Sequence, residues 1–243
     1  MKLIESIKLR HRANKYKNKY DVGGIAYLNS SVKKGQTVLD IGAHKAGYLY
    51  FMTNLVGSKG KVFAFEPQSN LYQYIKKIKD IFKWDNVTIE HLALSDSAGK
   101  VTLYIPSYKD SNSTSPGATI VEHKENSNFG SSETVSTETL DAYCSKFNIE
   151  PAFLKIDVEG NELRIFQGGI NTLKKFKPKI LVEIEERHVG KEKVLETFEF
   201  MESIGYTGHI LHGSKSIPLS DFNFDYYQNP NDMKNYCNNF IFE

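Results

Sequence analysis

The sequence predicts a doubly wound α/β fold, in which helices cover both faces of a mostly parallel sheet. Short runs rich in β-branched and other apolar residues recur along the chain, and segments with apolar residues at helical spacing separate them. The composition is that of an ordinary globular protein, because 40% of the 243 residues are hydrophobic and 25% are charged. No internal repeat and no domain boundary is evident.

The expected strands are apolar enough to be buried on both faces of a sheet. They are residues 37–41, 61–65, 86–94, 153–157 and 179–185, and residues 101–105 are expected to form an extra strand.

Helices are expected where apolar residues recur every three or four positions. The three sets are Leu71, Ile75, Ile78 and Phe82; Leu140, Tyr143, Cys144 and Phe147; and Val194, Leu195, Phe198 and Met201. We expect Ser69 or Asn70 to cap the first helix and Gly205 to end the third.

Residues 1–36 are expected to form a helical, basic arm ahead of the main domain, residues 37–243. The first 20 residues contain seven Lys or Arg residues and one acid, Glu5. Such an arm either contacts phosphates or anionic lipid, or is a solvated helix face. Residues 107–134 are polar, and an insertion of this length is expected to be a partly ordered lid.

Several classes of protein are disfavoured. No stretch resembles a signal peptide or approaches the roughly 18 apolar residues of a membrane span. Cys144 and Cys237 lack the spacing of a zinc site or a disulfide framework. The net charge of +2 argues against a strongly charged partner. We therefore expect a soluble, cytoplasmic protein.

Residues 38–50, VLDIGAHKAGYLY, contain the loop after the first strand, and three kinds of ligand are considered for this loop. A dinucleotide-binding turn needs G-x-G-x-x-G, but Ala43 and His44 follow Gly42. A phosphate-binding P-loop needs Lys and Ser or Thr where Tyr48 and Leu49 stand. Both phosphate-binding readings fail.

The third ligand is S-adenosylmethionine, which has an amino-acid tail and no phosphate. Asp40 can meet its ammonium group, Gly42 lets the backbone approach, and Gly47 lets the next helix pack closely. Glu66 ends the second strand, where a carboxylate can accept hydrogen bonds from ribose hydroxyls. Leu94, Ser95 and Asp96 follow at the third strand end and can flank the adenine. Singly, Asp40 can be a capping acid and Glu66 a solvated loop charge.

The chain resembles the FkbM family of class I, S-adenosylmethionine-dependent methyltransferases. The matching stretches are VLDIGAHKAGYLYFM, KVFAFEPQSNLYQYI, NVTIEHLALSD, TVSTETLDAY, FLKIDVEGNELRIFQGG and PKILVEIEERH, within residues 37–188. The resemblance implies a Rossmann-like, seven-stranded sheet whose last strand, in NNFIFE, is antiparallel. It also implies methylation of an oxygen on a sugar or another small molecule.

The candidate cofactor-binding residues are Asp40, Gly42, Ala43, His44, Gly47, Glu66, Pro67, Leu94, Ser95, Asp96 and Asp157. The family commonly has Asn at the position of His44. If His44 binds the ligand's tail, its charge is expected to depend on pH near neutrality. The alternative is a simple loop histidine.

The candidate catalytic residues are Asp157, Glu183, Lys155 and His188, at the ends of the fourth and fifth strands. An alcohol acceptor profits from a general base, and Asp157 and Glu183 are the candidates. We favour a base or a substrate contact over a divalent-metal site and assign no metal ligands. Lys155 can instead form a structural salt bridge, and His188 can be a solvated strand end.

The resulting hypothesis is an S-adenosylmethionine-dependent O-methyltransferase that acts on a carbohydrate or a similar small hydroxylated metabolite. Its partners are then the cofactor and that acceptor, without nucleic acid, and a homodimer is left open. The rivals are a nucleic-acid methyltransferase, suggested by the basic arm, and a catalytically inactive binding module. An NAD-linked oxidoreductase is more distant, because G-x-G-x-x-G is absent.

Overall fold

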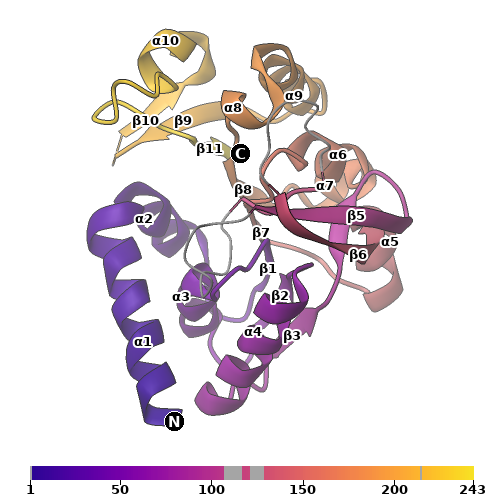
Figure 1. Cartoon of the computed structure of the whole chain (residues 1–243). Helices are drawn as coiled ribbons and strands as arrows, with labels where there is room; N and C mark the ends of the chain where they lie inside the picture. The colour runs from indigo at the N-terminus through magenta and orange to yellow at the C-terminus, as the bar shows by residue number, and fades with distance from the viewer. Residues whose placement is uncertain (1, 107–116, 121–128, 214) are drawn as a thin grey trace.

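An eight-stranded sheet lies between two layers of helices in the computed structural model, which describes residues 2–106, 117–120, 129–213 and 215–243 (Figure 1). The strand order is β10-β9-β11-β8-β7-β1-β2-β3. In chain order these strands are β1 (Thr37–Ile41), β2 (Lys61–Phe65), β3 (Val87–Glu90), β7 (Phe153–Ile156), β8 (Lys179–Glu183), β9 (Gly208–His212), β10 (Lys215–Pro218) and β11 (Asn239–Phe242).

The sheet is mainly parallel with an antiparallel end, as predicted. Strands β3, β2, β1, β7 and β8 pair in parallel. The last strand, β11, is antiparallel to both β8 and β9. The predicted number of seven strands is wrong for the described residues, because β10 folds back on β9 and adds an antiparallel edge strand.

A second, three-stranded sheet with the order β4-β6-β5 lies beside the carboxyl edge of the main sheet. It contains β4 (Ala93–Ser95), β5 (Gly99–Pro106) and β6 (Phe129–Thr139). The extra strand expected at 101–105 is thus present as β5. The single strand expected at 86–94 is instead two strands, β3 and β4, in different sheets.

The polar segment 107–134 is partly strand, because its last residues belong to β6. Residues 117–120 are also described, and Thr119 pairs with Tyr104 of β5 through two backbone hydrogen bonds of 2.9 and 3.0 Å. The rest of the expected lid lies outside the described residues. The Thr119 hydroxyl donates to the backbone carbonyl of Glu159 at 2.7 Å, so this segment reaches the turn after β7.

Helices cover the two faces of the main sheet. One face packs against α2 (Val22–Ser31), α3 (Gly47–Val56) and α4 (Ser69–Phe82), and α1 (Lys2–Lys15) packs on the outside of α3 and α4. The other packs against α5 (Leu140–Phe147), α6 (Glu162–Gln167), α7 (Ile170–Phe176) and α9 (Lys191–Ser203). Three short helices lie in the C-terminal part of the described structure: α8 (Glu186–Val189), η2 (Leu219–Asp221) and α10 (Phe224–Tyr227).

Helix α4 begins at Ser69, and its N-cap is Gln68 rather than Ser69 or Asn70. The Gln68 side chain makes no capping hydrogen bond. Glu133 of β6 takes this role, since its carboxylate accepts from the Ser69 backbone N–H at 2.9 Å and from the Ser69 hydroxyl at 2.5 Å. The small sheet is therefore tied to the start of α4.

The N-terminal segment packs on the sheet's helical layer. Leu9 and Ala13 of α1 are buried against it, and a π-helical turn, Tyr16–Tyr20, joins α1 to α2. The side chain of Asp21 caps α2 by accepting from the Gly24 backbone N–H at 2.9 Å. Among the helices of the described residues, none has the length and apolar character that a membrane crossing requires.

Candidate functional site

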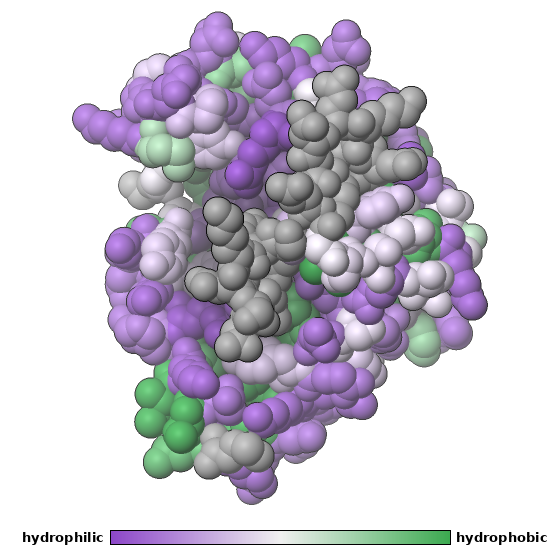
Figure 2. Space-filling model, in the orientation of Figure 1, coloured by the Kyte–Doolittle hydropathy of each residue, from purple (hydrophilic) through white to green (hydrophobic). Residues whose placement is uncertain are grey.

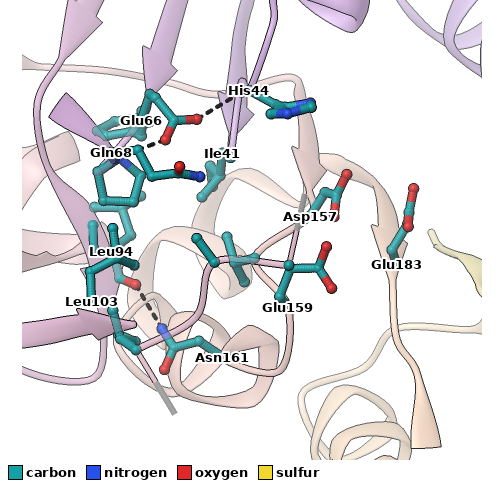
Figure 3. Close-up of a pocket in the computed structure, with 18 of the residues that line it drawn as sticks. Ile41, His44, Glu66, Gln68, Leu94, Leu103, Asp157, Glu159, Asn161 and Glu183 are labelled. Carbon is teal, nitrogen blue, oxygen red and sulfur yellow. Dashed lines mark hydrogen bonds between the residues drawn. The ribbon is translucent and has the colours of Figure 1, made fainter. Parts of the chain in front are cut away.

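A cavity lies at the carboxyl ends of β1, β2, β7 and β8, bordered by the small sheet and the 117–120 segment (Figure 3). This is the edge where open α/β sheets bind ligands, because the loops that leave parallel strands converge there. Seven of the residues predicted for the site line the cavity: Gly42, His44, Glu66, Pro67, Leu94, Asp157 and Glu183.

Glu66 lies at the end of β2, with only 2% of its surface exposed. One of its carboxylate oxygens accepts from the His44 backbone N–H at 2.8 Å and the other from the Gln68 backbone N–H at 2.9 Å (Figure 3). Burial raises the pKa of Glu66 to about 7, although these two hydrogen bonds act in the opposite direction. The carboxylate is thus fixed in position, with lone pairs left for a ligand.

His44 has a left-handed backbone, with φ of +47°, and its side chain lines the cavity. Its Nε2 atom is buried and has no hydrogen-bond partner among the described residues. Burial, followed by the nearby Lys45 ammonium, lowers the pKa of His44 to about 4. Without a ligand the imidazole is therefore neutral at physiological pH, and the expected pH dependence of a ligand-bound His44 stays a prediction.

The two glycines of the first loop differ in what they contact. Gly42 has φ of +83°, and a Cβ at this position would lie 1.9 Å from the Asp157 backbone oxygen. This glycine lets the loop after β1 pass close to the loop after β7. A Cβ on Gly47 would instead meet the Tyr16 ring at 3.1 Å, so Gly47 accommodates the N-terminal segment. Gly47 itself does not line the cavity, and neither does Ala43, which is buried.

Three other predicted cofactor residues lie away from the cavity wall. Asp40 is buried within β1, and its Oδ2 atom has no hydrogen-bond partner among the described residues. Burial raises the pKa of Asp40 to about 7, partly offset by Lys155. Ser95 is buried in β4, while Asp96 is exposed and lies 3.9 Å from Arg164. Of the three residues at this strand end, only Leu94 lines the cavity.

The side of the cavity opposite Glu66 is acidic. Figure 3 shows Asp157, Glu159 and Glu183 gathered there, at the ends of β7 and β8. Burial raises the pKa of Glu159 to about 8, and the nearby carboxylates of Asp157 and Glu185 add to this. Burial and the Asp157 carboxylate likewise raise the pKa of Glu183 well above its ordinary value. A ligand that donates hydrogen bonds or carries positive charge would relieve this repulsion.

His188 does not line the cavity but contacts one of its walls. Its Nε2 atom lies 3.0 Å from a carboxylate oxygen of Glu159. Because α8 carries His188, this contact ties α8 to the turn after β7 and orients the Glu159 side chain.

Lys155 lies behind the acidic side rather than on the cavity wall. It is 2% exposed, its ammonium is 3.2 Å from the Asp157 carboxylate, and it packs 5.0 Å from the centre of the Tyr48 ring. Although burial disfavours its charge, the surrounding carboxylates of Asp157, Glu183, Asp40 and Asp21 raise the pKa of Lys155. The lysine remains charged and compensates several acids.

A second charged pair borders the acidic side. The Glu185 carboxylate is held by Arg187 through contacts of 2.6 and 2.8 Å and also accepts from the Tyr236 hydroxyl. The Asn238 amide donates to both Glu183 and Glu185, at 3.0 and 2.9 Å. Tyr236 and Asn238, in the segment before β11, thus position the acids at the end of β8 and just after it.

Several cavity residues were not predicted. Tyr16 lines it from the N-terminal segment, and burial raises its pKa to about 12, with the Asp157 carboxylate adding to this. Asn161 lines it from the turn before α6, donates to the Leu94 carbonyl at 2.9 Å, and has a buried Oδ1 without a partner among the described residues. Apolar walls come from Ile41, Phe65, Leu92, Leu103 and Ile120.

Two cavity residues that were not among the predicted site residues could have been predicted from the sequence. Glu159 and Asn161 belong to KIDVEGNE, the stretch most typical of the family that the chain resembles, so both could have been proposed. Tyr16 had no such signal, because only the packing of the N-terminal segment brings it to the cavity.

The residues present fit S-adenosylmethionine. Glu66 is fixed where ribose hydroxyls could donate to it, and apolar side chains on the β4 and β5 side offer walls for a flat base. Two buried polar atoms at the cavity, His44 Nε2 and Asn161 Oδ1, have hydrogen-bonding capacity that the described residues leave unused. The carboxylates on the acidic side favour a cationic sulfonium in the space between them and Glu66. Within the described ranges, no group of three or more His, Cys, Asp or Glu residues is arranged to hold a metal ion.

Comparison with known proteins points to methyltransferases. The model of the methyltransferase FkbM domain matches residues 40–207, more than half of the chain. No curated protein matches the chain. A methyltransferase FkbM from Methylobacillus flagellatus KT is similar in structure, with a TM-score of 0.55, 15% identity and coverage of 88% of this chain and 44% of that one. The present chain thus spans less than half of that protein.

Two further solved structures have the same fold over most of the chain. A putative rRNA-methylase from Clostridium thermocellum has a TM-score of 0.51 and 14% identity, covering 92% of this chain and 94% of that one. Fibrillarin from Aeropyrum pernix, solved with natively bound S-adenosyl-L-methionine, has a TM-score of 0.50 and 10% identity, covering 90% and 72%. At these identities the likeness concerns the fold.

Proposed function

Because the chain belongs to the methyltransferase FkbM family, we propose that it transfers a methyl group from S-adenosylmethionine to a hydroxyl oxygen of a carbohydrate or a similar small metabolite. One observation carries this proposal. The cavity has a fixed carboxylate, Glu66, on one side and three carboxylates, Asp157, Glu159 and Glu183, on the other. The first side suits a ribose, and the second suits an acceptor with several hydroxyls.

On the Glu66 side, the protein would bind and orient the cofactor, whose sulfonium supplies an electrophilic methyl group. Glu66 would accept from the ribose hydroxyls. His44, neutral at physiological pH, and the backbone around Gly42 would contact the amino-acid tail. Leu94 and Leu103 would flank the adenine.

On the acidic side, Asp157 or Glu183 would accept the proton of the acceptor hydroxyl, as a general base. Burial and the neighbouring Asp157 carboxylate raise the pKa of Glu183, which makes its ionised form a stronger base toward an alcohol. Lys155 would keep Asp157 in position from behind, at 3.2 Å, and would not touch the acceptor. Methyl transfer is an in-line displacement, so this positioning is expected to contribute much of the rate.

The first alternative is a nucleic-acid methyltransferase, suggested by the basic N-terminal residues. Five acids among the described residues line the cavity, Glu66, Asp157, Glu159, Glu183 and Glu185, against one lining arginine that is paired with Glu185. Such a cavity repels a phosphate backbone. Binding to an oligonucleotide that weakens steeply with salt would revive this alternative.

Calorimetric titration tests the cofactor. We expect S-adenosylmethionine to bind with micromolar affinity, about −8 kcal/mol, and NAD and ATP not to bind. Glu66→Ala should abolish this binding, whereas Glu196→Ala, at an exposed position on α9, should leave it unchanged. Tight binding of NAD or ATP instead would contradict the assignment of the cofactor.

A panel of acceptors tests the reaction. Sugars, polysaccharide fragments and other polyols are incubated with S-adenosylmethionine, and mass spectrometry looks for a gain of one methyl group on oxygen. The O-methyl proposal is refuted if the protein binds the cofactor and methylates an amine or an oligonucleotide but no hydroxylated compound. The assignment of the cofactor would then still stand. Binding with no product from any acceptor class would favour the second alternative, an inactive binding module.

A further inference from the structure

Three large apolar side chains are exposed together on the first two turns of α1. The exposed fractions are 72% for Leu3, 56% for Ile4 and 58% for Ile7. Figure 2 shows this hydrophobic area at the lower left, over the N-terminal end of α1. We call these three residues the α1 patch. The methyltransferase reaction proposed above makes no use of it.

The α1 patch is not the face by which α1 packs on the protein. That face contains Leu9 and Ala13, which are buried against the helical layer of the sheet. Residues 3, 4 and 7 share a different side of the helix, since positions three and four apart are neighbours on its surface. Clustered apolar side chains on a surface typically mark an interaction site.

Exposed basic side chains are numerous along the N-terminal segment that carries the α1 patch. Lys2 and Lys8 are exposed beside it, and Arg10, Lys15, Lys17 and Lys19 are exposed further along the same segment. The one acid in the first 20 residues, Glu5, is largely buried and lies 3.6 Å from Lys8 and 3.9 Å from Lys77 of α4. Its charge is therefore compensated, and the surface around the patch has a positive excess.

We propose that the α1 patch docks the protein on an anionic phospholipid surface. Leu3, Ile4 and Ile7 would enter the boundary between head groups and acyl chains, while the lysines around them contact lipid phosphates. This combination of an apolar centre and a basic rim favours a membrane over the other candidates. Nucleic acid gives the aliphatic side chains nothing to bury against, and a second copy of the chain would bring its own basic rim against this one.

Flotation of the full chain with vesicles tests the proposal. We expect binding to phosphatidylcholine vesicles that contain phosphatidylglycerol, little binding to pure phosphatidylcholine, and weaker binding at high salt. The triple variant Leu3→Ser, Ile4→Ser, Ile7→Ser should bind about tenfold more weakly or worse. The control is Met233→Ser, since Met233 is also 72% exposed but lies in the segment before β11. This variant should bind as the wild type does.

A second variant reports insertion directly and does not depend on a loss of binding. Trp84, the chain's one native tryptophan, is buried, so Ile7→Trp adds an exposed fluorophore. Its emission should shift to shorter wavelength with anionic vesicles.

Three results would overturn the proposal. They are an unchanged emission of Ile7→Trp with anionic vesicles, equal binding of the triple variant and the wild type, and a dimer in analytical ultracentrifugation that the triple variant loses. The last would assign the patch to a second copy of the chain. Binding of S-adenosylmethionine, measured in parallel, keeps this test separate from that of the methyltransferase.

Discussion

The ammonium of Lys155 lies 3.2 Å from the carboxylate of Asp157, with the lysine inside the protein and the aspartate on the cavity wall. The pair spans the boundary between scaffold and site. On the Asp157 side is the space proposed for the acceptor. On the Lys155 side are Asp40 and the ring of Tyr48, both buried. Replacing Asp157 and replacing Lys155 should therefore have different effects.

Replacing Asp157 with Asn should affect chemistry more than cofactor binding. The amide keeps the shape of the side chain but cannot accept the acceptor's proton. We expect turnover of a methylated acceptor to fall by about 10²–10⁴-fold, as for loss of a general base. Calorimetry should show little change in affinity for S-adenosylmethionine. Normal turnover in this variant would remove Asp157 from the proposed mechanism, and Glu183→Gln would then be the variant to compare.

Replacing Lys155 with Met should destabilise the protein. The substitution leaves several buried acids without their cation, and breaking a buried pair from one side typically costs about 3–5 kcal/mol. Urea denaturation measures the free energy of unfolding. The matched control is Lys179→Met, because the Lys179–Glu243 pair is 47% and 42% exposed, and such surface pairs contribute below about 1 kcal/mol. Equal losses in the two variants would mean that Lys155 does not compensate the buried acids.

Replacing Gly42 with Ala should be far more damaging than replacing Gly35 with Ala. Both glycines have φ of +83°, so each alanine carries backbone strain of about 1–3 kcal/mol. A Cβ on Gly35 meets nothing within 4 Å, whereas one on Gly42 lies 1.9 Å from the Asp157 oxygen. Gly42→Ala should also lose affinity for S-adenosylmethionine, as seen by calorimetry. Similar unfolding free energies for both variants would show that the loops after β1 and β7 can separate without cost.

The buried carboxyls predict an unusual pH dependence of stability. Folding raises the pKa of Glu66 from its ordinary 4.5 to about 7, so the folded protein holds this proton more tightly than the unfolded chain. The stabilisation is complete below pH 4.5 and is lost as the pH rises through about 7. Asp40 and Glu162 act in the same direction, since burial raises both of their pKa values to about 7.

Unfolding measured from pH 4 to pH 8 in wild type and Glu66→Gln isolates the Glu66 contribution. A glutamine side chain has one oxygen and can accept only one of the two backbone hydrogen bonds that Glu66 accepts. The resulting loss of stability does not depend on pH. The wild type should lose stability relative to the variant as the pH rises, and its affinity for S-adenosylmethionine should increase over the same range. Parallel curves for the two proteins would contradict the assigned pKa of Glu66.

The main sheet was predictable because its strands are buried on both faces. Such strands appear as short apolar runs, and five of the expected runs do contain strands of the main sheet. β6 was not recognised, because FGSSETVSTET is polar and is half exposed in a small sheet. The break between β3 and β4 was also missed. Nothing in NVTIEHLAL indicates that the chain leaves one sheet and joins another.

The acids of the candidate site were predictable where they stand at a strand end or directly after it. Glu66 and Asp157 directly follow β2 and β7, Glu183 is the last residue of β8, and all three line the cavity. Asp40 and Lys155 are one or two positions further back along their strands, and this small displacement moves them from the wall into the interior. Tyr16 comes from packing between distant segments, and such contacts have no local pattern in the sequence.

The hydrogen bond from Thr119 to Glu159 ends on a backbone carbonyl, so it does not depend on which side chain occupies position 159. Glu159 has a backbone φ of +57°, a conformation that Asn, Asp and Gly adopt more readily than Glu. Position 159 can therefore change its charge while its backbone contact with Thr119 stays, and the contact that a substitution loses is the one with His188. Under the proposed function, single substitutions at this position would alter the charge offered to the acceptor.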